Sequence, residues 1–294
     1  MVKDLLKRRL IAEGYTTHPL IKGYFEFIFD EKEKKSCHKA IYEYFGRIAK
    51  DKPETLEEMQ PLFEQVYHGC SAGLYDEVDK NVYRDKIGGE PCGYKITQKL
   101  GAEGINLSLV RNFFPNEDLS QMPLVSEKRD QSWLLNEAGL ALLNIGRPKE
   151  AEEPFLTAIK MDIKDTGGKN ASVGYQNLAG LQFRTGRLEE GLSSAQKALE
   201  LAEKAKFEQY ISISKAYLAW ILYLMGKFEG LKSKPWLYEN TPFEGHVRFI
   251  DQNWKKVTAH YLDPRIPSTN NASENFAGFF RRHQYGKGLR SKEK

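Results

Sequence analysis

Cysteine is scarce in this chain of 294 residues, which contains three: Cys37, Cys70 and Cys92. Their number is odd, they lie far apart, and none forms a C-x-x-C pair, so the pattern argues against a disulfide framework or a structural zinc site. Thiols in this arrangement are compatible with a reducing compartment.

Long apolar runs are also missing. The most hydrophobic stretch, residues 216–225, is about half the length of roughly 18 residues that a membrane-spanning helix needs. The N-terminus, MVKDLLKRRLIAEGY, lacks the apolar core of a secretory signal. We therefore expect a cytoplasmic protein that does not enter a membrane.

Motifs for phosphate binding and for catalysis are absent as well. The glycine-rich turn at residues 88–93 is followed by Tyr94 where a P-loop has lysine, so nothing there would hold β- and γ-phosphates. The six histidines include no H-x-x-x-H pair. His68 lies near Cys70, but both fall on an amphipathic helix, and we interpret Cys70 as a buried structural residue rather than a nucleophile. The sequence thus predicts no catalytic residue, no metal, no cofactor and no enzymatic activity.

The net charge of the chain is small, and the positive charge is unevenly distributed along it. The net charge is +4, whereas residues 249–294 alone carry nine Lys and Arg against four Asp and Glu. Any affinity for a polyanion would therefore belong to this tail.

What the sequence does contain is a repeat. Gly146-Arg147, Gly186-Arg187 and Gly226-Lys227 follow one another at intervals of 40 residues, each after an apolar helical stretch. Self-similarity at a period of about 20–50 residues is typical of stacked helical repeats, which act through an extended surface. We therefore predict an all-α fold built from helical hairpins.

Alignment on these glycines brings small residues together. Gly139, Ala179 and Ala219 share one position in the first helix of each repeat, where a small side chain lets two helix backbones approach closely. Pro235 falls where the second helix of the third repeat would run, so we expect the array to stop within that repeat.

Four segments are expected along the chain. Residues 1–50 form a winged-helix remnant or an N-terminal helical cap, 51–125 form helical hairpins, 131–230 form the repeats, and 231–294 form a less regular basic tail. Within these segments, Thr55 with Glu58 predicts a capping box, and residues 94–113 are expected to form one helix. The spacing of Ile41, Tyr44, Phe45 and Ile48 predicts one apolar helix face.

The repeats resemble tetratricopeptide repeats. Gly139, Gly146, Ala151, Phe155 and Ala158 match that pattern well, although the spacing of 40 exceeds the usual 34. The resemblance implies a right-handed solenoid whose first helices line a groove that binds a protein or peptide. Carried over position by position, the groove residues are Trp133, Asn136, Asn144, Gln176, Arg184, Trp220 and Tyr223.

A narrower resemblance covers residues 15–230. The run His18-Pro19-Leu20-Ile21-Lys22-Gly23-Tyr24-Phe25 looks like the end of the winged-helix segment that joins the nucleotide domain to the repeats in bacterial STAND (NB-ARC-like) signalling ATPases. The run Thr55-Leu56-Glu57-Glu58-Met59-Gln60-Pro61-Leu62-Phe63 looks like the first sensor hairpin of that group. The resemblance implies a sensor region that lacks its nucleotide domain.

The tail resembles the C-terminal end of D-D-E insertion-sequence transposases. The run Ile266-Pro267-Ser268-Thr269-Asn270-Asn271, followed by Glu274, carries this resemblance. In that family the glutamate is a metal ligand, but here a role for Glu274 would require a transposase core, which the preceding repeats do not supply. The resemblance also implies DNA contacts by Arg281, Arg282, Lys287 and Arg290.

Three functional hypotheses follow. The first is a non-catalytic scaffold that binds a protein or peptide; the second is a DNA-associated protein that binds through its basic tail. The third is a non-functional gene-fusion remnant. The sequence does not identify the partner or the oligomeric state.

Overall fold

A computed structural model of the chain describes residues 23, 27–89, 94–165 and 169–227. The described residues are helical with no strand, which confirms the all-α prediction, and none of their helices is long and apolar enough to cross a membrane. The contacts divide the chain into two compact units, residues 1–100 and 101–294. Each unit is described by itself.

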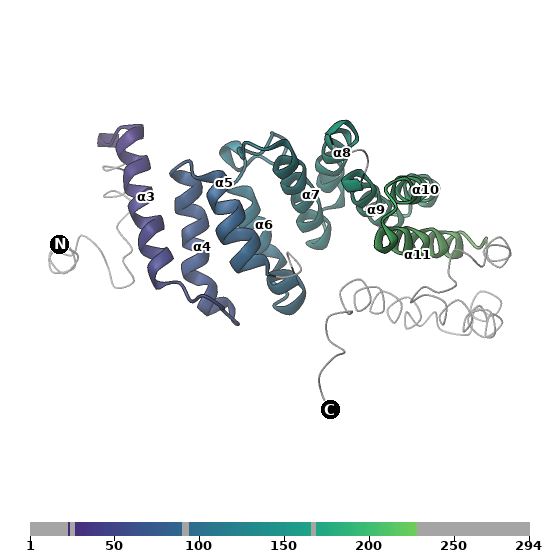
Figure 1. Cartoon of the computed structure of the whole chain (residues 1–294), viewed down its shortest axis with the longest axis horizontal. Coiled ribbons are helices and arrows are strands. Elements are labelled where there is room, and N and C mark those ends of the chain that lie inside the picture. The colour runs from purple at the N-terminus through teal and green to yellow at the C-terminus, as the bar shows by residue number, and fades with distance from the viewer. Residues whose placement is uncertain (1–22, 24–26, 90–93, 166–168, 228–294) are drawn as a thin grey trace, which may run out of the picture. The chain divides into compact units, whose positions relative to one another are not determined.

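In the first unit, α3 (Glu31–Ile48) packs against α4 (Leu56–Ser71), as Figure 1 shows. Asp30 caps α3 in a reciprocal box with Glu33. At α4 the Thr55 side chain accepts a bond from the Glu58 backbone N–H, as predicted, whereas the Glu58 carboxylate accepts from Glu54 N–H at 2.7 Å. The predicted box is therefore half formed.

The expected apolar face of α3 is wrong in its details. Tyr42 is the buried residue of this helix, and its hydroxyl donates to Glu77 at 2.8 Å. Of the four predicted residues, Phe45 is half-buried and stacks on His68 of α4, whereas Ile41, Tyr44 and Ile48 are exposed. The helical spacing was right, but the face that meets α4 lies about a quarter turn away, because Tyr42 fits beside the small residue Gly69.

A short helix, α5 (Tyr75–Val78), continues into the π-helix η1 (Asp79–Gly88). The fully buried Asp79 accepts a hydrogen bond from Arg84 Nε at 3.0 Å, and its other oxygen forms an ion pair with Arg84 Nη2 at 2.6 Å. These residues are five apart, which is the period at which a π-helix closes its hydrogen bonds. The unit ends with the π-helix η2 (Tyr94–Lys99).

The second unit begins with α6 (Glu103–Arg111). Gly101 has φ +64 and separates η2 from α6, so the single helix expected over 94–113 is two helices. A 3-10 turn, η3 (Pro115–Glu117), lies in the segment before α7.

Five helices then form two hairpins and the start of a third. They are α7 (Lys128–Asn144), α8 (Pro148–Asp165), α9 (Lys169–Arg184), α10 (Leu188–Lys204) and α11 (Glu208–Leu224). Each packs against the next, and α9 also contacts both α7 and α11 (Figure 1). The first helices α7, α9 and α11 therefore form one layer, and the second helices α8 and α10 form the other.

The 40-residue glycines end the first helices. Gly146, Gly186 and Gly226 have φ of +83, +81 and +67, a left-handed conformation that glycine adopts without strain. In each turn the glycine N–H and the following N–H donate to carbonyls three and five residues back, which is the Schellman motif. The repeat read from the sequence is thus a repeated helix-ending turn.

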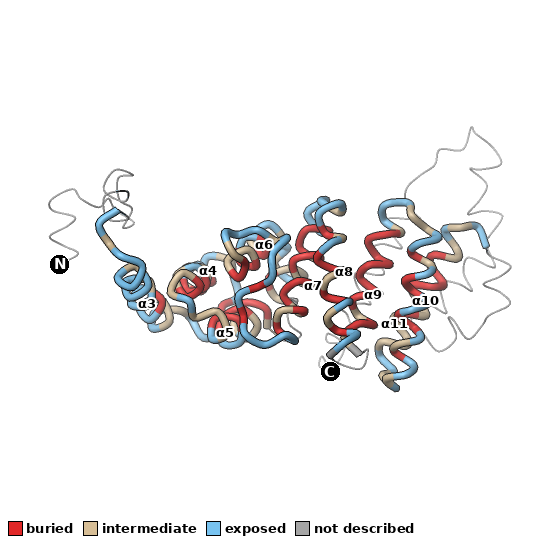
Figure 2. Tube along the Cα trace, turned by 90° about the horizontal axis from the view of Figure 1, so that it is seen from above, coloured by how far each residue is buried: buried red, intermediate tan, exposed pale blue. Residues whose placement is uncertain are grey.

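The small residues at the shared position of the first helices are buried where helices meet, as predicted. A Cβ on Gly139 would lie 2.6 Å from the ring of Phe155, which is fully buried on α8. Ala179 and Ala219 are also fully buried, and buried positions run along α7 to α10 (Figure 2). The absence of larger side chains at this position lets the first helices lie close to their neighbours.

Proline does not by itself end a helix in this chain, because α8 continues through Pro154 and α4 through Pro61. Pro235, on which the expected end of the array depends, lies outside the described residues.

Candidate functional site

The residues assigned to a groove all belong to the first-helix layer. Trp133, Asn136 and Asn144 lie on α7, Gln176 and Arg184 on α9, and Trp220 and Tyr223 on α11. The α9 helix lies between the other two and contacts both. The fold therefore brings these residues to three neighbouring helices, although they span 91 positions of the sequence (223 − 133 + 1).

Two of the amides hold neighbouring first helices together. Asn177 Nδ2 on α9 donates to Asn136 Oδ1 on α7 at 3.0 Å. Gln176 Nε2 donates to the Tyr210 carbonyl at 3.0 Å and to Ser214 Oγ at 2.9 Å, and both acceptors belong to α11. Since Gln176 and Ser214 are buried, losing these bonds would leave unpaired polar groups inside the protein. These amides fix the positions of the three helices relative to one another.

The other groove residues differ in exposure. Arg184 is exposed, Trp133 and Tyr223 are half-buried, and Trp220 is buried. The rings of Trp220 and Tyr223 stack, with centroids 5.3 Å apart and planes 25° apart. A guanidinium open to solvent binds carboxylates well, and half-buried aromatic rings supply contact area at low entropic cost.

An acidic residue lies at one end of α7. Asn144 Nδ2 donates to Glu103 Oε1 of α6 at 3.2 Å. Burial raises the pKa of the Glu103 carboxyl, and the bond from Asn144 opposes that shift. The other oxygen of Glu103 is buried without a hydrogen-bond partner. Sequence reasoning assigned Asn144 to the groove but missed Glu103, which lies before the repeats.

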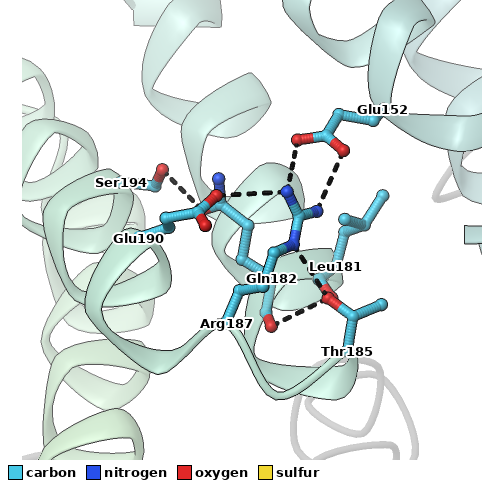
Figure 3. A network of polar contacts seen from close by, with 7 residues as sticks. All are labelled: Glu152, Leu181, Gln182, Thr185, Arg187, Glu190 and Ser194. Atoms are coloured by element: carbon cyan, nitrogen blue, oxygen red, sulfur yellow. Dashed lines mark hydrogen bonds and ion pairs between the residues drawn. The ribbon is translucent and has the colours of Figure 1, made fainter. Parts of the chain in front are cut away.

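A network of ion pairs connects the repeats and was also missed (Figure 3). Arg187, which follows the second turn glycine, donates from Nη1 and Nη2 to the two Glu152 oxygens of α8, each at 2.9 Å, and also meets Glu190 at 3.1 Å. Lys227, which follows the third glycine, pairs with Glu189 of α10 at 3.3 Å. The basic residue that follows each turn glycine is the sequence feature that could have predicted this network. At two of the three turns, this residue forms an ion pair with a glutamate on the preceding second helix.

Cys70 and the potential metal ligands were the remaining candidates for a reactive site. Cys70 is buried, and burial raises the pKa of its thiol far above the ordinary value, with the nearby Asp79 adding to the shift. The prediction that Cys70 is buried is therefore confirmed, and a raised thiol pKa leaves little thiolate at neutral pH. Within the described residues there is no group of three or more potential metal ligands.

The residues assigned to DNA contact, Arg281, Arg282, Lys287 and Arg290, lie outside the described residues, as does Glu274. Their assignment remains a prediction from the sequence.

In its described part, the chain is an all-helical protein whose helices pack as consecutive hairpins, with one layer of first helices that carries the candidate groove residues. Comparisons with protein-family models, with curated proteins and with solved structures found no match.

Proposed function

We propose that this chain is a non-catalytic scaffold of the tetratricopeptide type that binds a protein or peptide on its first-helix layer. The observation that carries the proposal is the set of side-chain bonds joining α7 to α9 and α9 to α11. These bonds preorganise the layer, and a preorganised surface loses less conformational entropy when a ligand binds.

The ligand proposed for this surface is an acidic peptide or one with a free C-terminal carboxylate. Arg184 is exposed on the central helix of the layer, and no polar contact to another described residue occupies its guanidinium. Tyr223 is half-buried on the neighbouring α11, where it stacks on the buried Trp220, and would contact apolar side chains of the ligand. A right-handed solenoid and a cytoplasmic location belong to the same proposal.

The proposed biological role is the sensor region of a STAND-like signalling ATPase without its nucleotide domain. The sequence resemblance over residues 15–230 supports this role, and a partner-binding repeat region is compatible with it. Binding to DNA through the basic tail, with its excess of five positive charges over residues 249–294, is the alternative.

The proposal is tested with an array of acidic peptides, each prepared with a free carboxylate and with an amide at its C-terminus. Arg184→Glu should weaken binding of the carboxylate peptides by roughly 10- to 100-fold, because a hydrogen bond to a charged group contributes about 1.5–3 kcal/mol. Lys160→Glu is the matched control, since Lys160 is an exposed cation on α8 in the other layer.

Equal binding by the two variants would place the binding surface elsewhere. Asn136 is a poor choice for this test because its bond to Asn177 also holds α7 to α9, so its substitution mixes binding with packing.

A further inference from the structure

The first unit contains a pair of histidines in direct contact across two helices. His38 of α3 and His68 of α4 lie with their Nδ1 atoms 2.7 Å apart, and their ring centroids are separated by 4.9 Å. Phe45 stacks over His68 at 6.2 Å, and the ring of Tyr67 meets both imidazoles edge-on. The pair is thus enclosed by aromatic rings, and the His68 side chain is only 16% exposed.

The separation identifies the contact as a hydrogen bond. Two nitrogens that share a tetrahedral metal ion, each about 2.0–2.1 Å from it, would lie roughly 3.3 Å apart. A hydrogen bond between two Nδ1 atoms needs a proton on one of them and a lone pair on the other. The two rings must therefore be in opposite tautomers.

The charge of Glu64 favours one of the two possible pairs of tautomers. Its Oε2 lies 3.8 Å from His68 Nε2, one helical turn away on α4. A carboxylate on this side favours a proton on Nε2 of His68, which leaves the lone pair on Nδ1. His38 then donates from Nδ1, and His68 accepts.

This arrangement determines how protonation changes the bond. While His68 is neutral, its Nδ1 lone pair accepts the bond, and a charge on the donor ring strengthens it. A proton added to His68 can enter only at Nδ1, where it removes the acceptor and, when His38 is charged, places two cations in contact. The bond between the helices therefore survives protonation of His38 and is broken by protonation of His68.

Among the residues that the structure describes, the other ionisable groups near the pair come from both helices. On α4 these are Glu64 and Tyr67, and on α3 the residues one turn before His38 are Lys34 and Lys35. Lys34 is paired with Glu31 at 2.9 Å. On the far side of the same interface Tyr42 meets Glu77, and Asp79 pairs with Arg84, so their charges are already engaged.

We propose that the His38–His68 pair is a proton-controlled latch that holds α3 on α4 at neutral pH and releases α3 when His68 is protonated. Since α3 packs on α4 among the described helices, its release would expose the faces that carry Tyr42 and Phe45 on α3 and Gly69 on α4. The latch lies in the first unit and is independent of the peptide-binding proposal.

The direction of the pH effect follows from the lone pair on His68. Burial, with a further contribution from His38, lowers the pKa of His68 from 6.5 to about 4. A group whose pKa is lowered on folding stabilises the folded form above its unfolded pKa, and this contribution is lost as the pH falls from about 6.5 towards 4. Acid should therefore open the latch.

Amide hydrogen exchange of the full chain tests the proposal at pH 7.0 and pH 5.0, with rates corrected for the intrinsic pH dependence. Protection of residues 31–48 should fall by about 20-fold at pH 5.0, the change that a pKa moved from 6.5 to about 4 produces. The α10 helix contains no histidine and serves as the internal control, whose protection should change much less.

His68→Asn supplies the matched variant, because its side-chain oxygen can accept the bond from His38 and does not titrate in this range. Its α3 protection should fall by less than about 3-fold between the two pH values. Ring ¹⁵N shifts of the wild-type protein give a second measurement and should show His68 with its proton on Nε2 and uncharged at pH 6. The latch is ruled out if α3 protection falls equally in both proteins or is constant in the wild type, or if His68 is already charged at pH 6.

Discussion

Replacing Gly139 by alanine should destabilise the protein, although alanine normally stabilises a helix relative to glycine. The reason is the contact of this position with the ring of Phe155. Gly139 lies in the middle of α7, and a Cβ there would be 2.6–2.9 Å from three atoms of the Phe155 ring. The ring is fully buried and cannot turn away without displacing its neighbours. Gly139→Ala therefore adds a methyl group where there is no room.

Two opposing terms set the magnitude. Alanine is better than glycine in a helix interior by about 1 kcal/mol, whereas overpacking a core costs about 1–3 kcal/mol. With contacts this short we expect Gly139→Ala to lower the free energy of unfolding of the second unit by about 1 kcal/mol. Phe155→Ala removes the ring and should cost about 3–5 kcal/mol by itself.

The double variant separates the two terms. Phe155→Ala removes the three ring atoms that crowd the new methyl, so the helix propensity of alanine should dominate. Gly139→Ala should then raise the free energy of unfolding of the Phe155→Ala protein by about 1 kcal/mol. The two substitutions are thus expected to couple by about 2 kcal/mol, well above the additivity error for distant sites.

Urea unfolding of the full chain, followed by amide exchange in peptides of α7 and α8, measures these free energies for the second unit. Gly104→Ala is the control, since a Cβ there meets nothing within 4 Å, and it should be neutral or mildly stabilising. If Gly139→Ala has the same sign with and without Phe155, the close-packing argument is refuted.

Two further predictions concern a turn and the thiols. Lys206 has φ +55 in a turn with the same hydrogen bonds as the glycine turns. Lys206→Gly should raise the free energy of unfolding by about 0.5–1 kcal/mol, because relief of left-handed strain exceeds the entropic cost of glycine. A lower thermal midpoint for this variant would contradict the prediction. Cys37 is exposed, whereas Cys70 is buried with a raised thiol pKa. Iodoacetamide at pH 8 should therefore alkylate Cys37 in the native protein and Cys70 only after unfolding, and peptide mass mapping measures both. Equal labelling of the two thiols would place Cys70 at the surface.

Local signals in the sequence predicted the helices and their ends. Gly146, Gly186 and Gly226 all have the left-handed backbone that a helix C-terminus uses, and the Thr55 cap is present. Such features depend on a few neighbouring residues, so a sequence shows them directly. The exception is Lys206, which ends α10 in the same geometry without a glycine and so carries no such signal.

The sequence predicted less well which face of a helix packs against the neighbouring helix. Its spacing favoured Ile41, Tyr44 and Ile48 as the inner face of α3, yet Tyr42 is the residue that packs inside. A helix with apolar residues on more than one side leaves this choice to its partner, and here Gly69 on α4 makes room for the Tyr42 ring.

By itself, the sequence determined the helical class, the 40-residue period and the small residues at Gly139, Ala179 and Ala219, because turn geometry and helix spacing are local properties. Only the tertiary structure decided the contacts between residues far apart in the chain. The His38–His68 bond joins positions 30 residues apart, and Arg187 reaches Glu152 over 35. Neither pair has a fixed sequence spacing, since each depends on how two separate helices come to lie side by side.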